Sequence, residues 1–116
     1  MAATVGYSRA VRVGGIVTVA GTAPVMPDGA DPPTDPYGQA RRCLEIVVAA
    51  LAELGAGPEH VVRTRTYLTR AEDWEEVGRA HGEVFGQARP AATMVVVAGL
   101  LDPSWLVEIE ADAIVA

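Results

Sequence analysis

The sequence has few of the residues that mark secreted, membrane or nucleic-acid-binding proteins. Only one of its 116 residues is a cysteine, Cys43, so no disulfide can form within the chain. No apolar run approaches the roughly 20 residues that cross a bilayer, and the N-terminus lacks the basic-then-apolar pattern of a secretion signal. The formal net charge of -6 argues against a surface that follows nucleic-acid phosphates. These absences predict one cytoplasmic domain, residues 1–116, with no membrane or nucleic-acid partner.

Signatures of metal and cofactor sites are missing too. No cluster of His and Cys residues has the spacing of metal ligands, and no Gly-rich turn joins a strand to a helix in a way that suits a phosphate. The sequence therefore predicts no metal and no cofactor.

The first half of the chain contains a hairpin and a helix. Apolar residues alternate from about residue 10 to 21 on both sides of Gly14-Gly15, a dipeptide typical of a tight turn between strands. After a loop rich in Pro, Gly and Asp, Asp35 is expected to cap a helix with Pro36 at its first position. Gly55 and Pro58 are expected to end that helix. Its predicted buried stripe is Ala40, Cys43, Val47, Ala50, Leu51 and Leu54.

The sequence pattern in the second half of the chain predicts three strands and one helix. The strands are expected at residues 61–69, 91–98 and 106–115. The helix is expected at residues 71–85, with an inner stripe of Trp74, Val77, His81 and Val84. The resulting order, β-β-α-β-α-β-β, favours an α+β fold in which both helices pack on one face of a mixed sheet.

The last predicted strand is acidic on one face. Glu108, Glu110 and Asp112 alternate with apolar residues, so all three carboxylates point to the same side of a sheet. Burying unpaired carboxylates is costly. They must therefore face solvent, cations or a wet cleft.

The sheet face away from the helices mixes polar and apolar groups. We expect it to carry Thr18, Arg63, Arg65, the pair Met94 and Val96, and Glu108. This mixture is too polar for a monomer core and too apolar for a free surface. The sequence therefore predicts a homo-oligomer in which a second subunit covers the face.

Four segments together resemble the RidA/YjgF family of reactive intermediate deaminases. They read YSRAVRVGGIVTVAGTAPV, DPYGQARRCLEIVVAALAELGAG, VVRTRTYL and RPAATMVVVAGLLDPSWLVEIEADAIV. The resemblance spans nearly the whole chain. It implies a chorismate-mutase-like α+β fold, a homotrimer, and clefts between subunits that receive a small metabolite. It also implies hydrolysis of enamines and imines to a carbonyl compound and ammonia.

The family's functional positions match only in part. Tyr7, Gly21 and Glu108 correspond to residues of the family's pocket. The arginine that holds the substrate carboxylate in the family's deaminases is replaced by Ala92. Gly78 stands where the family has a helix-borne asparagine, and Ala20 where it has a serine.

These replacements lead to a hypothesis about the ligand. Alanine cannot replace the two charge-assisted hydrogen bonds of an arginine, and both Ala92 and Gly78 leave space. We therefore expect a roomier pocket that prefers neutral or cationic ligands. Arg63 or Arg65 would permit an anionic substrate if either reached the pocket; alternatively, both pair with acids on neighbouring strands. The predicted substrate-binding residues are Gly21, Gly78, Ala92, Arg65 and Met94.

Glu108 and Tyr7 are the predicted catalytic residues. Glu108 could activate water for attack on the C=N carbon and return a proton to the departing ammonia. The alternative is a structural acid in a hydrogen-bond network. Tyr7 could bind ligand or water, or could merely pin the first strand. His81 is predicted to be a core histidine rather than a base, and Cys43 a core residue rather than a nucleophile.

Two classes of function follow. One is an enamine or imine hydrolase with an altered substrate. The other is a non-catalytic ligand-binding or regulatory trimer, because the arginine used by the known chemistry is missing. Ribonuclease activity, a third function associated with the family, is disfavoured by the acidic charge balance.

Overall fold

Two consecutive glycines turn the first pair of strands back on itself. Gly14 has a φ of +58°, a conformation that glycine adopts without steric cost, and it lies in the two-residue turn between β1 (Ala10–Val13) and β2 (Ile16–Thr22). The two strands pair antiparallel. The predicted hairpin is therefore confirmed.

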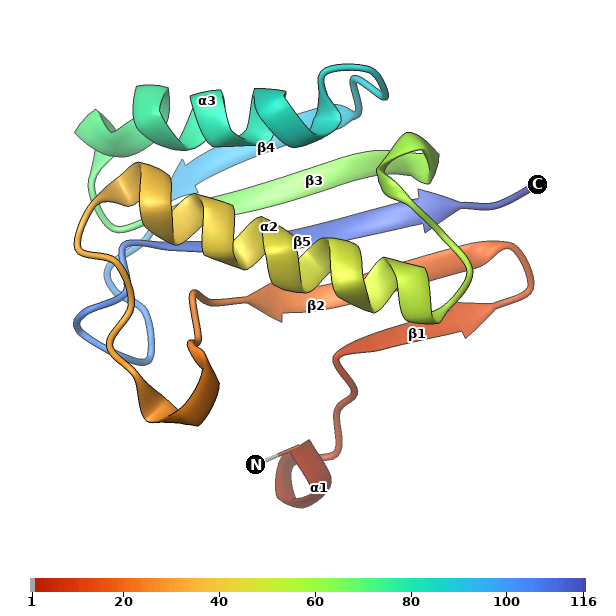
Figure 1. Ribbon diagram of the computed structural model, residues 1–116, viewed down its shortest axis with the longest axis horizontal. Coiled ribbons are helices and arrows are strands. Elements are labelled where there is room, and N and C mark those ends of the chain that lie inside the picture. Colours follow the sequence, from red (N-terminus) through yellow and green to blue (C-terminus); the bar gives the residue numbers. More distant parts are fainter. Residues whose placement is uncertain (1) are drawn as a thin grey trace.

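A computed structural model describes residues 2–116 and arranges them as two helices against one face of a five-stranded sheet (Figure 1). The remaining elements are α1 (Ala2–Val5), α2 (Pro36–Glu53), β3 (Val61–Leu68), α3 (Trp74–Phe85), β4 (Ala91–Val96) and β5 (Val107–Ile114). Short 3₁₀ turns lie at Pro27–Gly29, Pro58–His60 and Ala71–Asp73. The predicted order of five strands and two helices is confirmed; the short α1 was not predicted.

The sheet is mixed, as expected. Its strand order is β1-β2-β5-β3-β4. β3 and β4 run parallel, and the neighbouring pairs β1–β2, β2–β5 and β5–β3 run antiparallel. The parallel pair needs a crossover connection, which α3 supplies.

Helix α2 begins and ends where the sequence predicts. The Asp35 side chain accepts a hydrogen bond from the Gly38 N–H at 2.8 Å, and Pro36 is the first helical residue. Gly55, with a φ of +79°, follows the C-terminal end of the helix. The predicted stripe faces the sheet: Ala40, Cys43, Val47, Ala50 and Leu51 are buried, and Leu54 packs partly buried against the core.

Helix α3 differs from its prediction at the first turn. The stretch 71–73 forms a 3₁₀ turn, and the α-helix starts at Trp74. The buried residues of the helix are Val77, Ala80 and Phe85, whereas Trp74 is 57% exposed. The assignment of Trp74 to the inner stripe was therefore wrong, because helical periodicity does not say where the covering layer ends.

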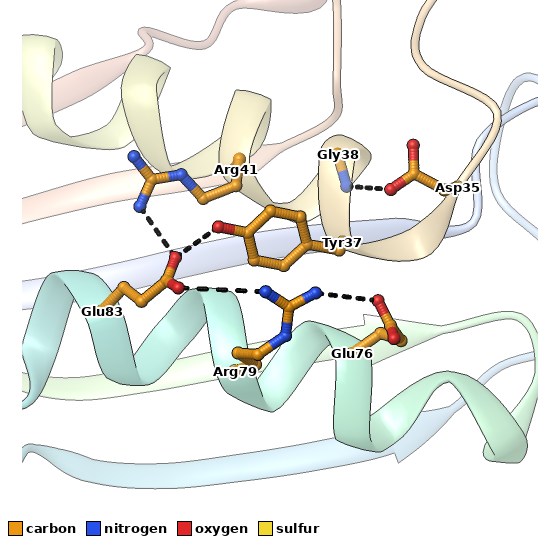
Figure 2. A network of polar contacts seen from close by, with 7 residues as sticks. All are labelled: Asp35, Tyr37, Gly38, Arg41, Glu76, Arg79 and Glu83. Carbon is orange, nitrogen blue, oxygen red and sulfur yellow. Dashed lines mark hydrogen bonds and ion pairs between the residues drawn. The ribbon is translucent and has the colours of Figure 1, made fainter.

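A polar cluster joins α2 to α3 at their outer surface (Figure 2). The Tyr37 hydroxyl donates a 2.5 Å hydrogen bond to Glu83, and the Arg41 Nη1 lies 3.3 Å from the same carboxylate. The Arg79 guanidinium lies 3.8 Å from the centre of the Tyr37 ring. These contacts hold the two helices side by side over the sheet.

The face of the sheet away from the helices, the open face, carries the acidic row. Glu108, Glu110 and Asp112 are half-buried there, while Val107, Ile109, Ala111 and Ala113 are buried under the helices. The placement of Thr18, Arg63, Arg65 and Glu108 on the open face agrees with the strand registers.

The placement of Met94 and Val96 on the open face was wrong. The parallel register pairs Thr66 with Met94 and Leu68 with Val96, and both Thr66 and Leu68 are buried on the helix side. Met94 accordingly packs against the core. The open-face residues of β4 are Ala91, Thr93 and Val95, because they pair with Arg63, Arg65 and Tyr67. In the described part of the chain, no helix combines the length and apolarity needed to span a bilayer.

Candidate functional site

The three positions that match the family's pocket lie around one cavity. Tyr7, Gly21 and Glu108 line a hollow of about 420 Å³ at the end of the sheet where β2 ends and β5 begins. Arg9, Ala23, Val25, Leu101, Asp102 and Trp105 complete its lining. The cavity thus joins residues from the N-terminal segment, two neighbouring strands and the loop between β4 and β5.

Gly21 occupies a position where a side chain would displace the Glu108 carboxylate. A Cβ atom built on Gly21 would lie 2.5 Å from Glu108 Oε2. The pairing of β2 with β5 is irregular between Val19 and Thr22, as is common next to functional sites. Glycine is therefore needed here for close approach rather than for an unusual φ.

The surroundings of Glu108 favour its protonated form more than water does. Its pKa is raised, chiefly because burial removes the carboxylate from solvent and secondly because Glu110 lies near it on the same strand. The positive charge of Arg9 acts in the opposite direction and lowers the pKa. A carboxyl group whose pKa is raised holds a proton more readily than an exposed glutamate does, which suits a group that takes up and returns a proton in general acid–base chemistry.

Arg9 is a charged residue of the cavity lining that the sequence did not single out. Its Nη1 donates to the Thr22 hydroxyl at 2.8 Å and to the carbonyls of Gly21 and Ala20 at 3.1 and 3.4 Å. The expectation of a pocket that prefers neutral or cationic ligands did not take this guanidinium into account. The signal was present in the sequence, since Tyr7 and Arg9 are two residues apart and an extended chain turns such residues to the same side.

A buried glutamine holds the loop that forms one wall of the cavity. The Gln39 side chain, 1% exposed, donates to the carbonyls of Pro33 and Ser104 at 2.8 and 2.9 Å. Its own carbonyl accepts from the Leu106 N–H at 2.7 Å. In the same loop, Asp102 accepts from the Ser104 N–H and hydroxyl, which lowers the pKa of Asp102. Gln39 therefore fixes the neighbours of Trp105 and, through them, the cavity wall.

Within residues 2–116, four of the predicted substrate-binding residues lie outside the lining of this cavity. Gly78 and Met94 face each other between α3 and β4, where a Cβ on Gly78 would lie 3.7 Å from Met94 Cε. Ala92 pairs with Thr64 on the same side of the sheet and is exposed near the start of the edge strand. A single copy of the chain therefore separates these residues from Glu108.

Arg65, the fourth, pairs with acids on the neighbouring strand. Its Nη1 lies 3.0 Å from Glu110 Oε1 and 3.6 Å from Asp112 Oδ2. The Tyr67 hydroxyl donates to the same Glu110 oxygen at 3.1 Å. The cross-strand pairing that the sequence left as an alternative is thus found for Arg65.

Of the two residues that the sequence assigned to the core, Cys43 is buried and His81 is half-buried. The His81 Nε2 lies 2.8 Å from the Thr64 hydroxyl, and burial lowers the pKa of His81. Cys43 is fully buried, its Sγ lies 3.8 Å from the carbonyl of Val107, and burial raises the pKa of its thiol. A buried thiol in this state is a poor nucleophile.

A second depression, about 390 Å³, lies between α2 and α3 and is lined mainly by Leu44, Val48 and Val84. Its charged residues, Arg41 and Glu45, are paired at the surface with Glu83 and Arg42. The cavity around Glu108 is the better candidate, because it holds a half-buried carboxyl group beside a guanidinium and a phenol. Among residues 2–116 there is no group of three side chains suited to hold a metal ion.

Comparisons with known proteins agree on one family. A family model described as Endoribonuclease L-PSP matches residues 1–115. A RutC family protein of Pyrococcus abyssi is 35% identical over 108 residues, which cover 92% of this chain and 84% of that protein. An uncharacterised protein of Streptomyces coelicolor is 43% identical over 108 residues, covering 93% and 81% of the two chains.

Solved structures share the fold over almost the whole chain. Rv2704 of Mycobacterium tuberculosis, described as a member of the YjgF/YER057c/UK114 family, superposes with a TM-score of 0.89 at 46% identity, covering 98% of this chain and 91% of that one. TdcF of Escherichia coli, solved with bound serine, has a TM-score of 0.87 at 27% identity, covering 95% and 88%. TdcF is named as a candidate reactive intermediate deaminase.

Proposed function

This chain belongs to the YjgF/RidA family, and on that premise we propose that it hydrolyses enamine or imine intermediates to a carbonyl compound and ammonia. The observation that carries the proposal is the meeting of Tyr7, Gly21 and Glu108 at one cavity, with the pKa of Glu108 raised. An enamine gives the same products, a carbonyl compound and ammonia, once it has tautomerised to the imine.

The proposed reaction needs one water and one proton carrier. The Glu108 carboxylate takes a proton from water as the oxygen attacks the C=N carbon, and it passes that proton to the imine nitrogen to give a neutral carbinolamine. Glu108 then takes the hydroxyl proton as the C=O bond forms and gives it to the nitrogen, so that the C–N bond breaks and ammonia leaves. Glu108 ends in the protonation state in which it began.

Water is the nucleophile in this scheme because the chain offers few alternatives. The sequence contains no lysine, so a lysine Schiff base cannot form. Its one thiol, Cys43, is fully buried. Tyr7 is assigned the role of orienting the ligand or the water through its phenol, which lines the same cavity.

We further propose that the working unit is a homotrimer and that the ligand binds at its subunit interfaces. The open face supports assembly, because exposed apolar residues border its charged row; they include Val11, Val13, Ile16, Val95 and Ile114. The cavity around Glu108 opens at the end of this face, where a neighbouring subunit could enclose it and bring Ala92, Gly78 or Met94 toward it. The reducing cytoplasm is the proposed compartment, since the chain has a single thiol and it is unpaired.

A second candidate function is ligand binding without catalysis. The alanine at position 92, where the family's deaminases have an arginine, favours it. Ribonuclease activity, which the description of the family model suggests, is not proposed, because a net charge of -6 opposes binding of a phosphate backbone.

The deciding experiment uses imines made in place by an amino-acid oxidase, with semicarbazide as a competing trap. Hydrolysis by this protein lowers semicarbazone formation. We expect Glu108→Gln to abolish that effect while leaving the fold and assembly intact, since glutamine keeps the size of the side chain but cannot carry the proton. Equal rates for the wild type and Glu108→Gln would refute the role of Glu108. A wild type that binds ligand but hydrolyses none of the imines offered would favour the non-catalytic function.

A further inference from the structure

We propose that Arg9 is the specificity-determining residue of this cavity and that it selects substrates that carry a carboxylate next to an apolar side chain. The inference rests on the proposed function and deepens it, because it assigns a substrate class: 2-imino acids with branched or aromatic side chains. It replaces the expectation of a neutral or cationic ligand, which was made without Arg9.

The anchoring of Arg9 leaves one edge of its guanidinium available. Only Nη1 is engaged, by Thr22, Gly21 and Ala20. In the described part of the chain, Nε and Nη2 make no hydrogen bond. These two nitrogens form the edge that binds a carboxylate through two parallel hydrogen bonds. An arginine already held in place loses less freedom when it binds a ligand, so its contribution to affinity is larger.

The charges around the cavity allow an anion to enter. Three charged residues line it: Arg9, Asp102 and Glu108. Asp102 is turned to its own loop, where its Oδ1 accepts two hydrogen bonds from Ser104. Glu108 has a raised pKa, so it gives up part of its negative charge more readily than an exposed glutamate. Arg9 is then the charged group whose hydrogen-bonding edge is open to a ligand.

The rest of the lining suits an apolar side chain. Ala23, Val25, Leu101 and Trp105 form this wall, and Leu101 is 86% exposed in the single chain. A volume of about 420 Å³ exceeds what a three-carbon acid fills. A branched or aromatic side chain would cover Leu101 and Trp105 and remove their apolar surface from water.

The test measures binding rather than turnover, with two probes of nearly the same shape, one charged and one neutral. The probes are 4-methyl-2-oxopentanoate, a stable product of the proposed hydrolysis, and its neutral amide, each titrated into the 116-residue protein in a calorimeter. We expect the wild type to bind the carboxylate roughly 10- to 100-fold more tightly than the amide, the range of a charge-assisted hydrogen-bonded pair. Equal affinity for the two probes overturns the inference without any variant.

Variants then assign the preference to Arg9. Arg9→Gln should weaken carboxylate binding by a similar factor and leave amide binding unchanged, and Arg9→Lys should give an intermediate loss. The matched control is Arg12→Gln, because Arg12 is also anchored to carbonyls, those of Gly14 and Leu54, but lies outside the cavity lining. An equal loss in Arg12→Gln contradicts the assignment. Thermal unfolding of each variant checks that it is folded.

The design separates this inference from the proposed function. If the wild type hydrolyses imines but Arg9→Gln keeps the carboxylate preference, only the role of Arg9 fails. If the carboxylate preference depends on Arg9 and no imine is hydrolysed, the role of Arg9 stands and the hydrolase proposal fails.

Discussion

At the scale of single residues, the site depends on a close approach between Gly21 and Glu108. A resemblance in sequence was enough to select Tyr7, Gly21 and Glu108, and all three line one cavity. It did not select Arg9, because Arg9 is not among the matched positions. Nor could it show that Gly21 is small because a carboxylate lies against it.

Gly21→Ala tests that close approach. The new Cβ would lie 2.5 Å from Glu108 Oε2, so the flexible carboxylate must move while the backbone stays. We expect the variant to fold normally and to lose turnover by roughly tenfold or more, since small displacements of a catalytic group are costly. Gly82→Ala is the control, because nothing lies within 4 Å of its added Cβ. Full activity in Gly21→Ala would show that the position of the carboxylate is not critical.

Glu108→Gln is expected to change stability in a pH-dependent way. A carboxyl group whose folded-state pKa is raised stabilises the fold fully below its unfolded pKa, and this contribution is lost as the pH rises through the folded pKa. Glutamine avoids that loss, so the melting temperature of the variant should exceed that of the wild type at pH 8 and not at pH 4. Differential scanning calorimetry at both pH values checks this.

The control for this measurement is Glu53→Gln, which removes a carboxylate from the exposed end of α2. An equal gain at pH 8 in the two variants would mean that the reduced net negative charge, rather than the surroundings of Glu108, is responsible.

At the scale of helices and strands, the ends of α2 depend on residues beside them in the sequence, whereas the orientation of β4 depends on its alignment with β3. The start and end of α2 were predictable because Asp35, Pro36 and Gly55 act on the backbone beside them. The face of β4 was not predictable, since it depends on how the strand aligns with β3 across a crossover. If the alignment of β4 with β3 shifted by one residue, Met94 would take the place of Val95 on the open face.

Asp35→Ala tests the cap of α2. The substitution removes the acceptor of the Gly38 N–H and should lower the free energy of unfolding by about 1 kcal/mol. Urea denaturation measures the change. Asp31→Ala is the matched control, because it removes an exposed carboxylate from the same loop without touching a helix end. A loss of equal size in the control would attribute the effect to charge rather than to capping.

At the scale of the whole molecule, the composition of the open face is not accounted for by a single chain surrounded by water. It combines the half-buried acidic row with exposed valines and isoleucines, while the opposite face is covered by α2 and α3 (Figure 1). Such a surface is more consistent with assembly than with exposure to water. Assembly would also determine which residues join the cavity around Glu108.

Light scattering on a size-exclusion column is therefore expected to report three times the 12.1-kDa chain mass at micromolar concentration. Val95→Glu should lower that mass and reduce turnover, because it places a charge on an exposed apolar residue of the open face, on the edge strand β4. Ala52→Glu, on the exposed side of α2, should leave both unchanged. A monomeric wild type would contradict the trimer and the interface site together.

The sequence by itself determined the order of the elements, the caps of α2, the alternation of acids with core residues along β5, and the family. Each of these depends on residues close together in the chain or on a pattern spread along its whole length. Only the tertiary structure decided that Arg9 shares a cavity with Glu108, that Gly21 makes room for a carboxylate, and that Met94 faces α3. These facts depend on which strands are neighbours and in what register, and that is settled by packing between segments distant in the sequence.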